Sequence, residues 1–157
     1  MKIFKRKNAG QLQNCPAVSV QDHTAILFAP SMSEAETAPF SALALAHIGD
    51  GVYELMTRTA LAQSGITSAS HLHRETVRRV NAPAQAKAAA AILNCLTDEE
   101  RTVFKRGRNA KVHGIPQRAD PAEYHSATGL EALFGWLWLQ GKTERLSTLF
   151  NVLSEVL

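Results

Sequence analysis

The sequence has few of the residues that cross-link a chain or carry it into a membrane. Its two cysteines, Cys15 and Cys95, are too few among 157 residues for a disulfide framework or a zinc site, and they fit a reducing compartment. No apolar run is long enough to cross a bilayer. A polar stretch follows the basic start at residues 2–7, where a signal peptide would need its apolar core. We therefore expect a cytoplasmic protein without a membrane partner.

Acidic residues are also fewer than basic ones, 14 against 17 Lys and Arg, and the excess of basic residues is largest in the middle of the chain. The net charge is +3 overall, but residues 71–118 hold ten Lys and Arg against four acids, a net charge of +6. Residues 31–70 and 119–157 each carry a net charge of −3. The densest basic run, Arg101–Arg118, suggests a polyanionic partner. A solvated basic helix explains the charge alone equally well.

Helical patterns dominate from Pro39 onward, and nothing marks a second large domain. We predict an all-α fold of about six helices, with residues 1–31 as a weakly structured extension and residues 32–157 as one domain. Pro39 suits the first position of a helix, and Thr97 fits a capping box. The expected helices are about 39–63, 71–80, 83–96, 98–110, 121–140 and 143–156.

Two acids stand in helices that are otherwise apolar. Asp50 lies between two glycines in the first long helix, where each glycine costs up to about 1 kcal/mol relative to alanine. Glu131 is the only charge in residues 127–139, with the small residues Thr128 and Gly135 about one turn to either side. An unpaired carboxylate in such surroundings costs several kcal/mol. Glu131 must therefore be protonated, paired with a cationic side chain or bound to a metal.

The ordinary explanation of either acid is a structural ion pair, for instance with Arg58 or Arg79. Two such acids on two apolar helices instead favour a site where carboxylates converge on a hard cation. Mg²⁺ fits best, because it needs few protein oxygens and keeps its waters for a substrate phosphate. Metal-assisted attack on a phosphodiester would follow, with the basic surface holding the polyanion through its phosphates.

Several stretches of the chain resemble motifs of the ribonuclease III family. Residues 48–54 (Ile-Gly-Asp-Gly-Val-Tyr-Glu) resemble the signature helix of its catalytic domain, and residues 128–139 resemble its second acidic motif. Residues 104–111, together with residues 76–86, are similar to Mini-ribonuclease III, the short form without a double-stranded-RNA-binding domain. The resemblance extends over about residues 38–157.

The resemblance implies an all-α ribonuclease III catalytic domain that forms a homodimer and cleaves both strands of double-stranded RNA with Mg²⁺. The implied process is maturation of the 23S ribosomal RNA precursor, with a ribosomal protein as a candidate helper. By motif position, Asp50 and Glu131 are the implied catalytic and metal-binding residues. The residues that we expect to bind RNA are Arg106, Arg108, Asn109, Lys111 and Arg79, with Arg78 and Gln85 as weaker candidates.

At three positions the chain differs from full-length ribonuclease III, as the short form also does. Family glutamates seven and four residues before the aspartate are Leu43 and Ala46 here, and an aspartate three residues before the glutamate is Thr128. Water and RNA phosphate must then fill more of the metal's coordination shell, so we expect weak Mg²⁺ binding without RNA. The loss leaves open an alternative, a catalytically inactive RNA-binding or ribosome-assembly protein on the same fold. Without the resemblance, an all-α DNA-binding or protein-interaction module would also be consistent with the sequence.

Other residues near these motifs have structural explanations. Glu54, one turn after Asp50, could assist at the metal, but a surface or paired acid is an equal alternative. We leave His47 out of the site, because Mg²⁺ prefers oxygen ligands. Trp136 and Trp138 are expected to pack in the core or in a dimer interface, because duplex RNA offers no free base faces.

Overall fold

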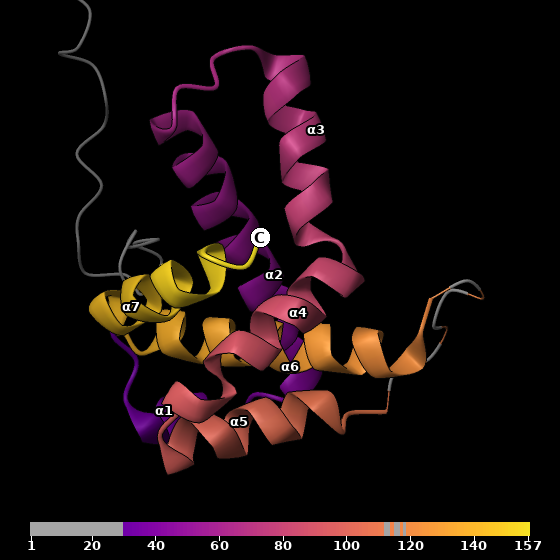
Figure 1. The fold of residues 1–157 in the computed structure, drawn as a ribbon. Coiled ribbons are helices and arrows are strands. Elements are labelled where there is room, and N and C mark those ends of the chain that lie inside the picture. The colour runs from indigo at the N-terminus through magenta and orange to yellow at the C-terminus, as the bar shows by residue number, and fades with distance from the viewer. Residues whose placement is uncertain (1–29, 112–113, 115–116, 118) are drawn as a thin grey trace, which may run out of the picture.

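Seven α-helices and one short 3₁₀ turn make up the part of the chain that the structure, a computed structural model, describes (Figure 1). This part comprises residues 30–111, 114, 117 and 119–157. The helices are α1 (Glu34–Thr37), α2 (Ala42–Gln63), α3 (Ala69–Val80), α4 (Ala82–Ile92), α5 (Asp98–Arg108), α6 (Pro121–Leu139) and α7 (Thr143–Ser154), with η1 (Leu93–Cys95) after α4. The prediction of an all-α fold is confirmed. None of the described helices is both long and apolar enough to span a membrane.

The helix that the sequence pattern did not predict is α1. The Ser33 hydroxyl accepts a hydrogen bond from the backbone N–H of Glu36, and the Glu36 carboxylate accepts one from the backbone N–H of Ser33. This capping box starts a single turn of helix. Just before it, the backbone N–H of Met32 donates to the carbonyl of Leu139 at 2.8 Å, which ties this segment to the end of α6. The predicted extension at residues 1–31 lies, up to residue 29, outside the described residues.

Side-chain caps decide where the longer helices begin. Ser41 caps α2, so this helix starts after Pro39 rather than at it. Ser68 caps α3, which therefore begins two residues before the predicted start. Thr97 and Glu100 form the reciprocal capping box that the sequence predicts for α5.

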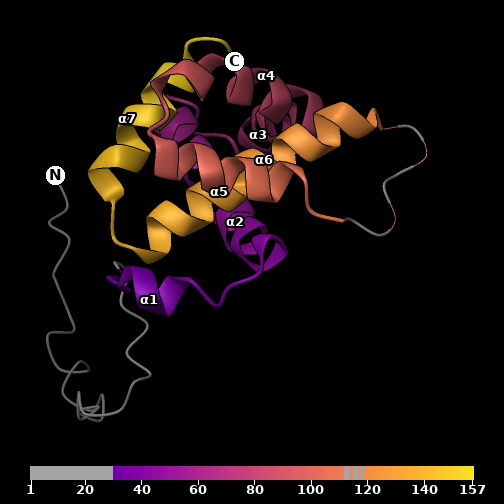
Figure 2. The same cartoon turned by 90° about the horizontal axis from the view of Figure 1, so that it is seen from below.

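Helix α6 is the centre of the fold, and α2, α4 and α5 pack against it (Figures 1 and 2). Because each side of α6 faces another helix, its buried residues occur all round its axis. They are Ala127, Thr128, Gly129, Leu130, Ala132, Leu133, Phe134, Gly135, Trp136 and Leu137.

Two glycines allow α2 and α6 to cross with their backbones in contact. A Cβ atom built on Gly49 would fall 1.7 Å from the carbonyl oxygen of Glu131, and one built on Gly135 would fall 2.0 Å from the carbonyl oxygen of Leu45. No side chain fits in either place. Gly51 differs, because a Cβ atom there would meet no described atom within 4 Å. Close backbone approach thus explains Gly49 but not Gly51.

Helix α7 closes the core through apolar contacts and one ion pair. The apolar side chains of Leu146, Leu149, Phe150 and Leu153 on this helix are all buried. Arg145, on the same helix, donates from Nε and Nη2 to the two carboxylate oxygens of Glu100 at 2.8 Å each. This bidentate pair links α7 to the first turn of α5.

Candidate active site

The two acids that the sequence places on separate helices lie together where α2 crosses α6. The backbone of Gly49 contacts that of Glu131, and Asp50 is the next residue along α2. The negative charge of Asp50 also contributes to a raised pKa of Glu131, which shows that the two carboxylates are near each other. We call these two residues the acid pair. Their catalytic role stays a prediction.

Burial controls the charge state of Glu131. Burial is the main cause that raises the pKa of Glu131 to about 7, the charge of Asp50 adds to it, and the amide of Gln85 acts in the opposite direction. Removal from water penalises the charged carboxylate. Asp50, by contrast, is exposed to solvent. Near neutral pH, Glu131 therefore carries a proton part of the time, and a cation placed beside it would favour release of that proton.

Among the described residues, the acid pair has no cationic partner. Arg58 pairs with Glu54 on the surface of α2, and Arg79 pairs with Glu75 at 2.8 Å on α3. Within the described ranges, no Lys, Arg or His nitrogen lies within 4.0 Å of either carboxylate of the pair. The two arginines considered as structural partners are thus engaged elsewhere, and Glu54 is the paired surface acid of the alternative interpretation.

Gln85 is the residue near the acid pair whose place the sequence analysis misjudged. Its side chain is only 1% exposed, so the weak prediction that it binds RNA is wrong. It lies on α4 beside Glu131 and helps to lower the pKa of that carboxyl. Its position in the sequence could have indicated this burial, because Gln85 is an amide in an alanine-rich helix. A polar side chain that is buried in such a helix needs a hydrogen-bond partner inside the protein.

Comparisons with known proteins agree with this geometry. The ribonuclease III domain family matches residues 43–142. A Mini-ribonuclease 3 of Symbiobacterium thermophilum is 45% identical over 113 residues, which cover 72% of this chain and 87% of that protein. A Mini-ribonuclease 3 of Enterococcus faecalis is 45% identical over 111 residues, which cover 69% and 84%.

The chain belongs to the ribonuclease III family. Within this family it belongs with the Mini-ribonuclease 3 proteins, and it is an endoribonuclease. A crystal structure of a protein from Fusobacterium nucleatum has a similar fold, with a TM-score of 0.67 and 32% identity over 74% of this chain and 93% of that one.

The three departures from full-length ribonuclease III add no further acids to the site. Ala46 is buried, Leu43 is 41% exposed, and the Thr128 hydroxyl donates to the carbonyl of Tyr124 at 3.0 Å. Among the residues that the structure describes, no group of three or more His, Cys, Asp or Glu side chains could hold a metal ion. In the part of the chain that the structure describes, the acid pair is therefore not joined by a third side chain of these types.

The basic motif of this ribonuclease III domain is anchored close to the acid pair through α5. A Cβ atom built on Gly107 would fall 2.8 Å from the carbonyl oxygen of Thr128, one turn before Glu131 on α6. Arg108, Asn109 and Lys111 follow directly and are exposed at the end of α5.

Arg106 takes a different direction from its neighbours in the motif. Its Nη2 donates to the carbonyl of Phe40 at 2.6 Å, and it lines a hollow beside α1 and Trp136. The structure does not bring Arg106 to the acid pair, and its RNA-binding role stays a prediction.

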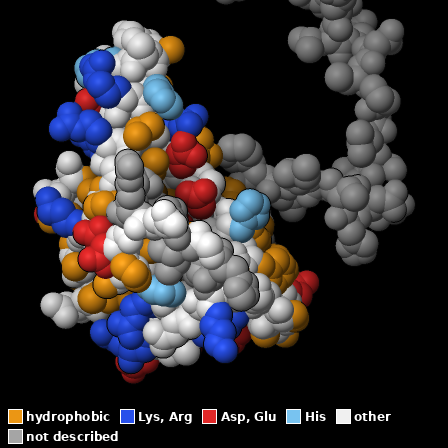
Figure 3. Space-filling view, turned by 90° about the vertical axis from the view of Figure 1, so that its right-hand side faces the viewer, with side chains coloured by type: hydrophobic (Ala, Val, Ile, Leu, Met, Phe, Trp, Pro, Cys, Tyr) orange, Lys and Arg blue, Asp and Glu red, His pale blue; other side chains and the backbone are white. Residues whose placement is uncertain are grey.

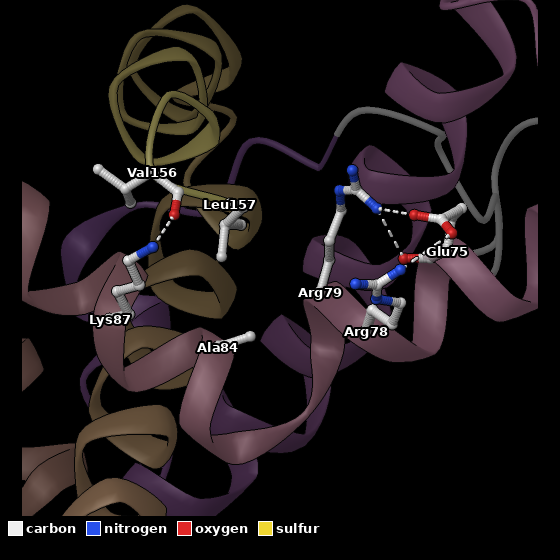
Figure 4. Close-up of a pocket in the computed structure, with 7 residues that line it drawn as sticks. All are labelled: Glu75, Arg78, Arg79, Ala84, Lys87, Val156 and Leu157. Carbon is white, nitrogen blue, oxygen red and sulfur yellow. Dashed lines mark hydrogen bonds and ion pairs between the residues drawn. The ribbon is translucent and has the colours of Figure 1, made fainter.

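Arg79 lies in a second basic region, a hollow of about 290 Å³ between α3, α4 and residues 156–157 (Figure 4). Its guanidinium is held by Glu75, while Arg78 and Lys87 also line the hollow. The hydroxyl of Tyr53, three residues after Asp50, donates to the backbone carbonyl of Arg79 at 3.4 Å. This hydrogen bond ties the end of α3 to α2.

The charges divide into zones on one face of the molecule. Figure 3 shows acidic side chains near the middle of this face, with Lys and Arg side chains above, toward α3, and below, toward α5. The cations on α3 are Arg74, Arg78 and Arg79, and those on the last turn of α5 are Lys105, Arg106 and Arg108. An acidic centre between two basic zones can hold a polyanion by its phosphates while leaving the centre available to a metal ion.

Proposed function

We propose that this ribonuclease III enzyme cleaves double-stranded RNA with Mg²⁺, that Asp50 and Glu131 are its catalytic and metal-holding residues, and that the 23S ribosomal RNA precursor is its substrate in the cytoplasm. The observation that carries the proposal is the acid pair. Two carboxylates from crossing helices lie together, and no cationic side chain in the described parts of the chain neutralises them.

The donor set of the acid pair fits Mg²⁺. Mg²⁺ prefers hard oxygen ligands and is commonly held by one or two carboxylates together with water and substrate phosphate. Bound there, it would supply electrostatic stabilisation of the scissile phosphate. Asp50 is exposed and meets the RNA side, whereas Glu131 holds its carboxylate from the interior. Because the described residues bring two carboxylates together here, water and RNA phosphate would complete the coordination of the ion in this proposal.

The exposed cations at the end of α5 hold the RNA backbone in this proposal. Arg108, Asn109 and Lys111 contact phosphates near the acid pair, and Arg79 and Arg106 contribute from the two sides. Contacts to phosphate position a duplex without reading its sequence, so binding should weaken strongly as salt increases.

A homodimer is supported by an apolar groove between α2 and α7. Its volume is about 380 Å³, and its lining includes Ile48, Val52, Leu55, Met56, Trp138 and Leu146. Leu55 is 52% exposed, which is unusual for a large apolar side chain in a cluster. A second copy packed on this groove would cover it and would hold two acid pairs at a fixed separation, because Asp50 and Leu55 lie on the same helix.

The test is cleavage of duplex RNA with and without Mg²⁺ by the wild type, Asp50→Asn and Glu54→Gln. We expect Asp50→Asn to lose at least about 100-fold in cleavage rate while still binding the duplex. Glu54→Gln is the matched control, because it removes an acid one turn away that pairs with Arg58, and it should cut like the wild type. Equal cutting by Asp50→Asn and the wild type would refute the proposed site. The substrate is tested by comparing the cleavage of a 23S precursor stem with that of an unrelated duplex of equal length. Repeating both reactions with ribosomal protein tests the helper.

A further inference from the structure

Gln85 combines complete burial with an incomplete set of hydrogen bonds. Its side chain is 1% exposed, and its Nε2 has no hydrogen-bond partner within 3.5 Å among the described residues. A buried amide without a partner is costly, and native proteins keep few of them without a reason. An alanine or leucine would fill this position in an otherwise alanine-rich helix at no such cost.

The group that the Gln85 amide faces is the Glu131 carboxylate. Helix α4, which carries Gln85, packs against α6, which carries Glu131, and the amide acts on the pKa of that carboxyl as a hydrogen-bond donor does, although no hydrogen bond of ordinary geometry joins them. Because the amide is neutral, it can orient a carboxylate without cancelling its charge. A lysine or arginine in the same place would form an ion pair with Glu131 and compete with any metal ion.

The backbone that carries Gln85 is held at several points. The side-chain oxygen of Asn81 accepts a hydrogen bond from the backbone N–H of Ala84 at 3.0 Å. The backbone carbonyl of Asn81 accepts one from the backbone N–H of Gln85 at 2.9 Å. Just before this cap, Tyr53 binds the carbonyl of Arg79. The amide therefore projects from a fixed helix start toward α6.

We propose that Gln85 is a positioning residue, whose side-chain amide holds the Glu131 carboxylate in the orientation that lets it share a divalent cation with Asp50. This inference rests on the proposed function. Partners that orient a metal ligand in this way commonly change metal affinity or activity by about 10–100-fold when removed.

The first experiment compares Gln85→Met with Ala90→Met, a control at an exposed position on the same helix. Methionine keeps the volume of glutamine and removes the N–H donor. We expect Gln85→Met to raise the Mg²⁺ concentration for half-maximal cleavage about tenfold with little change in KM for duplex RNA. Its unfolding temperature should be equal to or above that of the wild type, because a buried polar group without a partner is removed. An unchanged Mg²⁺ requirement and kcat in Gln85→Met would overturn the proposal.

A second measurement does not depend on cleavage. In ¹⁵N NMR spectra, the signal of the Gln85 side-chain amide should differ between the wild type and Glu131→Gln. In the wild type, the same signal should also shift when Mg²⁺ alone is added. A Gln85 signal that moves in neither case would also overturn the proposal, even if Gln85→Met failed to fold.

The Asp50→Asn variant separates the hypothesis on Gln85 from the proposed function. If it is inactive while Gln85→Met behaves as the wild type, only the role of Gln85 fails, and if it cuts normally, the proposed function fails.

Discussion

Two glutamates on neighbouring helices, Glu100 on α5 and Glu131 on α6, have opposite electrostatic surroundings. Glu100 is 4% exposed, and the bidentate hydrogen bonds from Arg145 lower its pKa despite its burial. Burial and the charge of Asp50 raise the pKa of Glu131 to about 7, and no arginine in the described parts of the chain pairs with it. The surroundings thus favour the charged form of Glu100 and disfavour the charged form of Glu131.

This difference separates an acid that stabilises the fold from one that is available for chemistry. The charge of Glu100 is already satisfied by Arg145 and by the backbone N–H of Thr97, so nothing else is needed there. The charge of Glu131 has no cationic partner among the described residues, so a cation that binds from outside would stabilise it. A group that is kept free for binding lowers the stability of the fold. Such groups are therefore found mainly at functional sites, where the function requires them.

The largest effect should come from breaking the contact that sets the surroundings of Glu131. Gly49→Ala places a Cβ atom 1.7 Å from the Glu131 carbonyl oxygen, so α2 and α6 must separate. We expect it to lower the free energy of unfolding by about 3 kcal/mol or more, measured in urea. Gly51→Ala, whose Cβ meets no described atom within 4 Å, should instead stabilise the chain by up to about 1 kcal/mol. Because Gly51 also lines the apolar groove of the proposed dimer, this gain applies to a single copy of the chain, and a loss of stability in Gly51→Ala would show that a second copy lies against Gly51. A tolerated Gly49→Ala would contradict the crossing.

Replacing the unpaired acid should abolish cleavage and stabilise the fold. A pKa of about 7 in the folded state, above the usual 4.5, means that the folded chain binds this proton more tightly than the unfolded one. Without divalent cations, that contribution to stability is complete below about pH 4.5 and is lost as the pH rises to about 7. Glu131→Gln should therefore be more stable than the wild type at pH 8, by on the order of 3 kcal/mol, as measured in urea with a chelator. Equal stability of the two proteins at pH 8 would show that the charged Glu131 carboxylate does not destabilise the fold.

Breaking the paired acid should have a smaller effect of the opposite sign. Arg145→Met leaves Glu100 buried without its partner, but the Arg145 side chain is 30% exposed, and water reduces the effect to about 2 kcal/mol of lost stability. The lowered pKa of Glu100 means that the pair contributes above the usual pKa and is lost as the pH falls through the folded value. Glu144→Gln, exposed on the same helix, is the control. The Mg²⁺ requirement for cleavage should be unchanged in Arg145→Met, and a raised requirement would show that the two glutamates are coupled.

Local signals predicted the helices well and the positions of individual side chains less well. Thr97 and Glu100 form the predicted capping box, because such a cap depends only on residues close in sequence. Both glycines beside Asp50 are costly in a helix, but only Gly49 closely approaches α6, and a Cβ atom on Gly51 would meet no described atom within 4 Å. Both stand between Asp50 and a β-branched apolar residue, so the position of α6 distinguishes them.

The sequence by itself determined the helical architecture, the family and the presence of two acids in apolar helices, because periodicity, caps and motifs are written in neighbouring residues. Tertiary structure decided which charges are paired. It gave Arg145 to Glu100, on another helix, and it placed the neutral amide of Gln85 beside Glu131, whereas the pair of Arg58 with Glu54 lies one turn apart within α2. Pairing of buried charges depends on contacts between helices far apart in the chain, and a side chain's direction across such a contact is fixed only when the helices are packed.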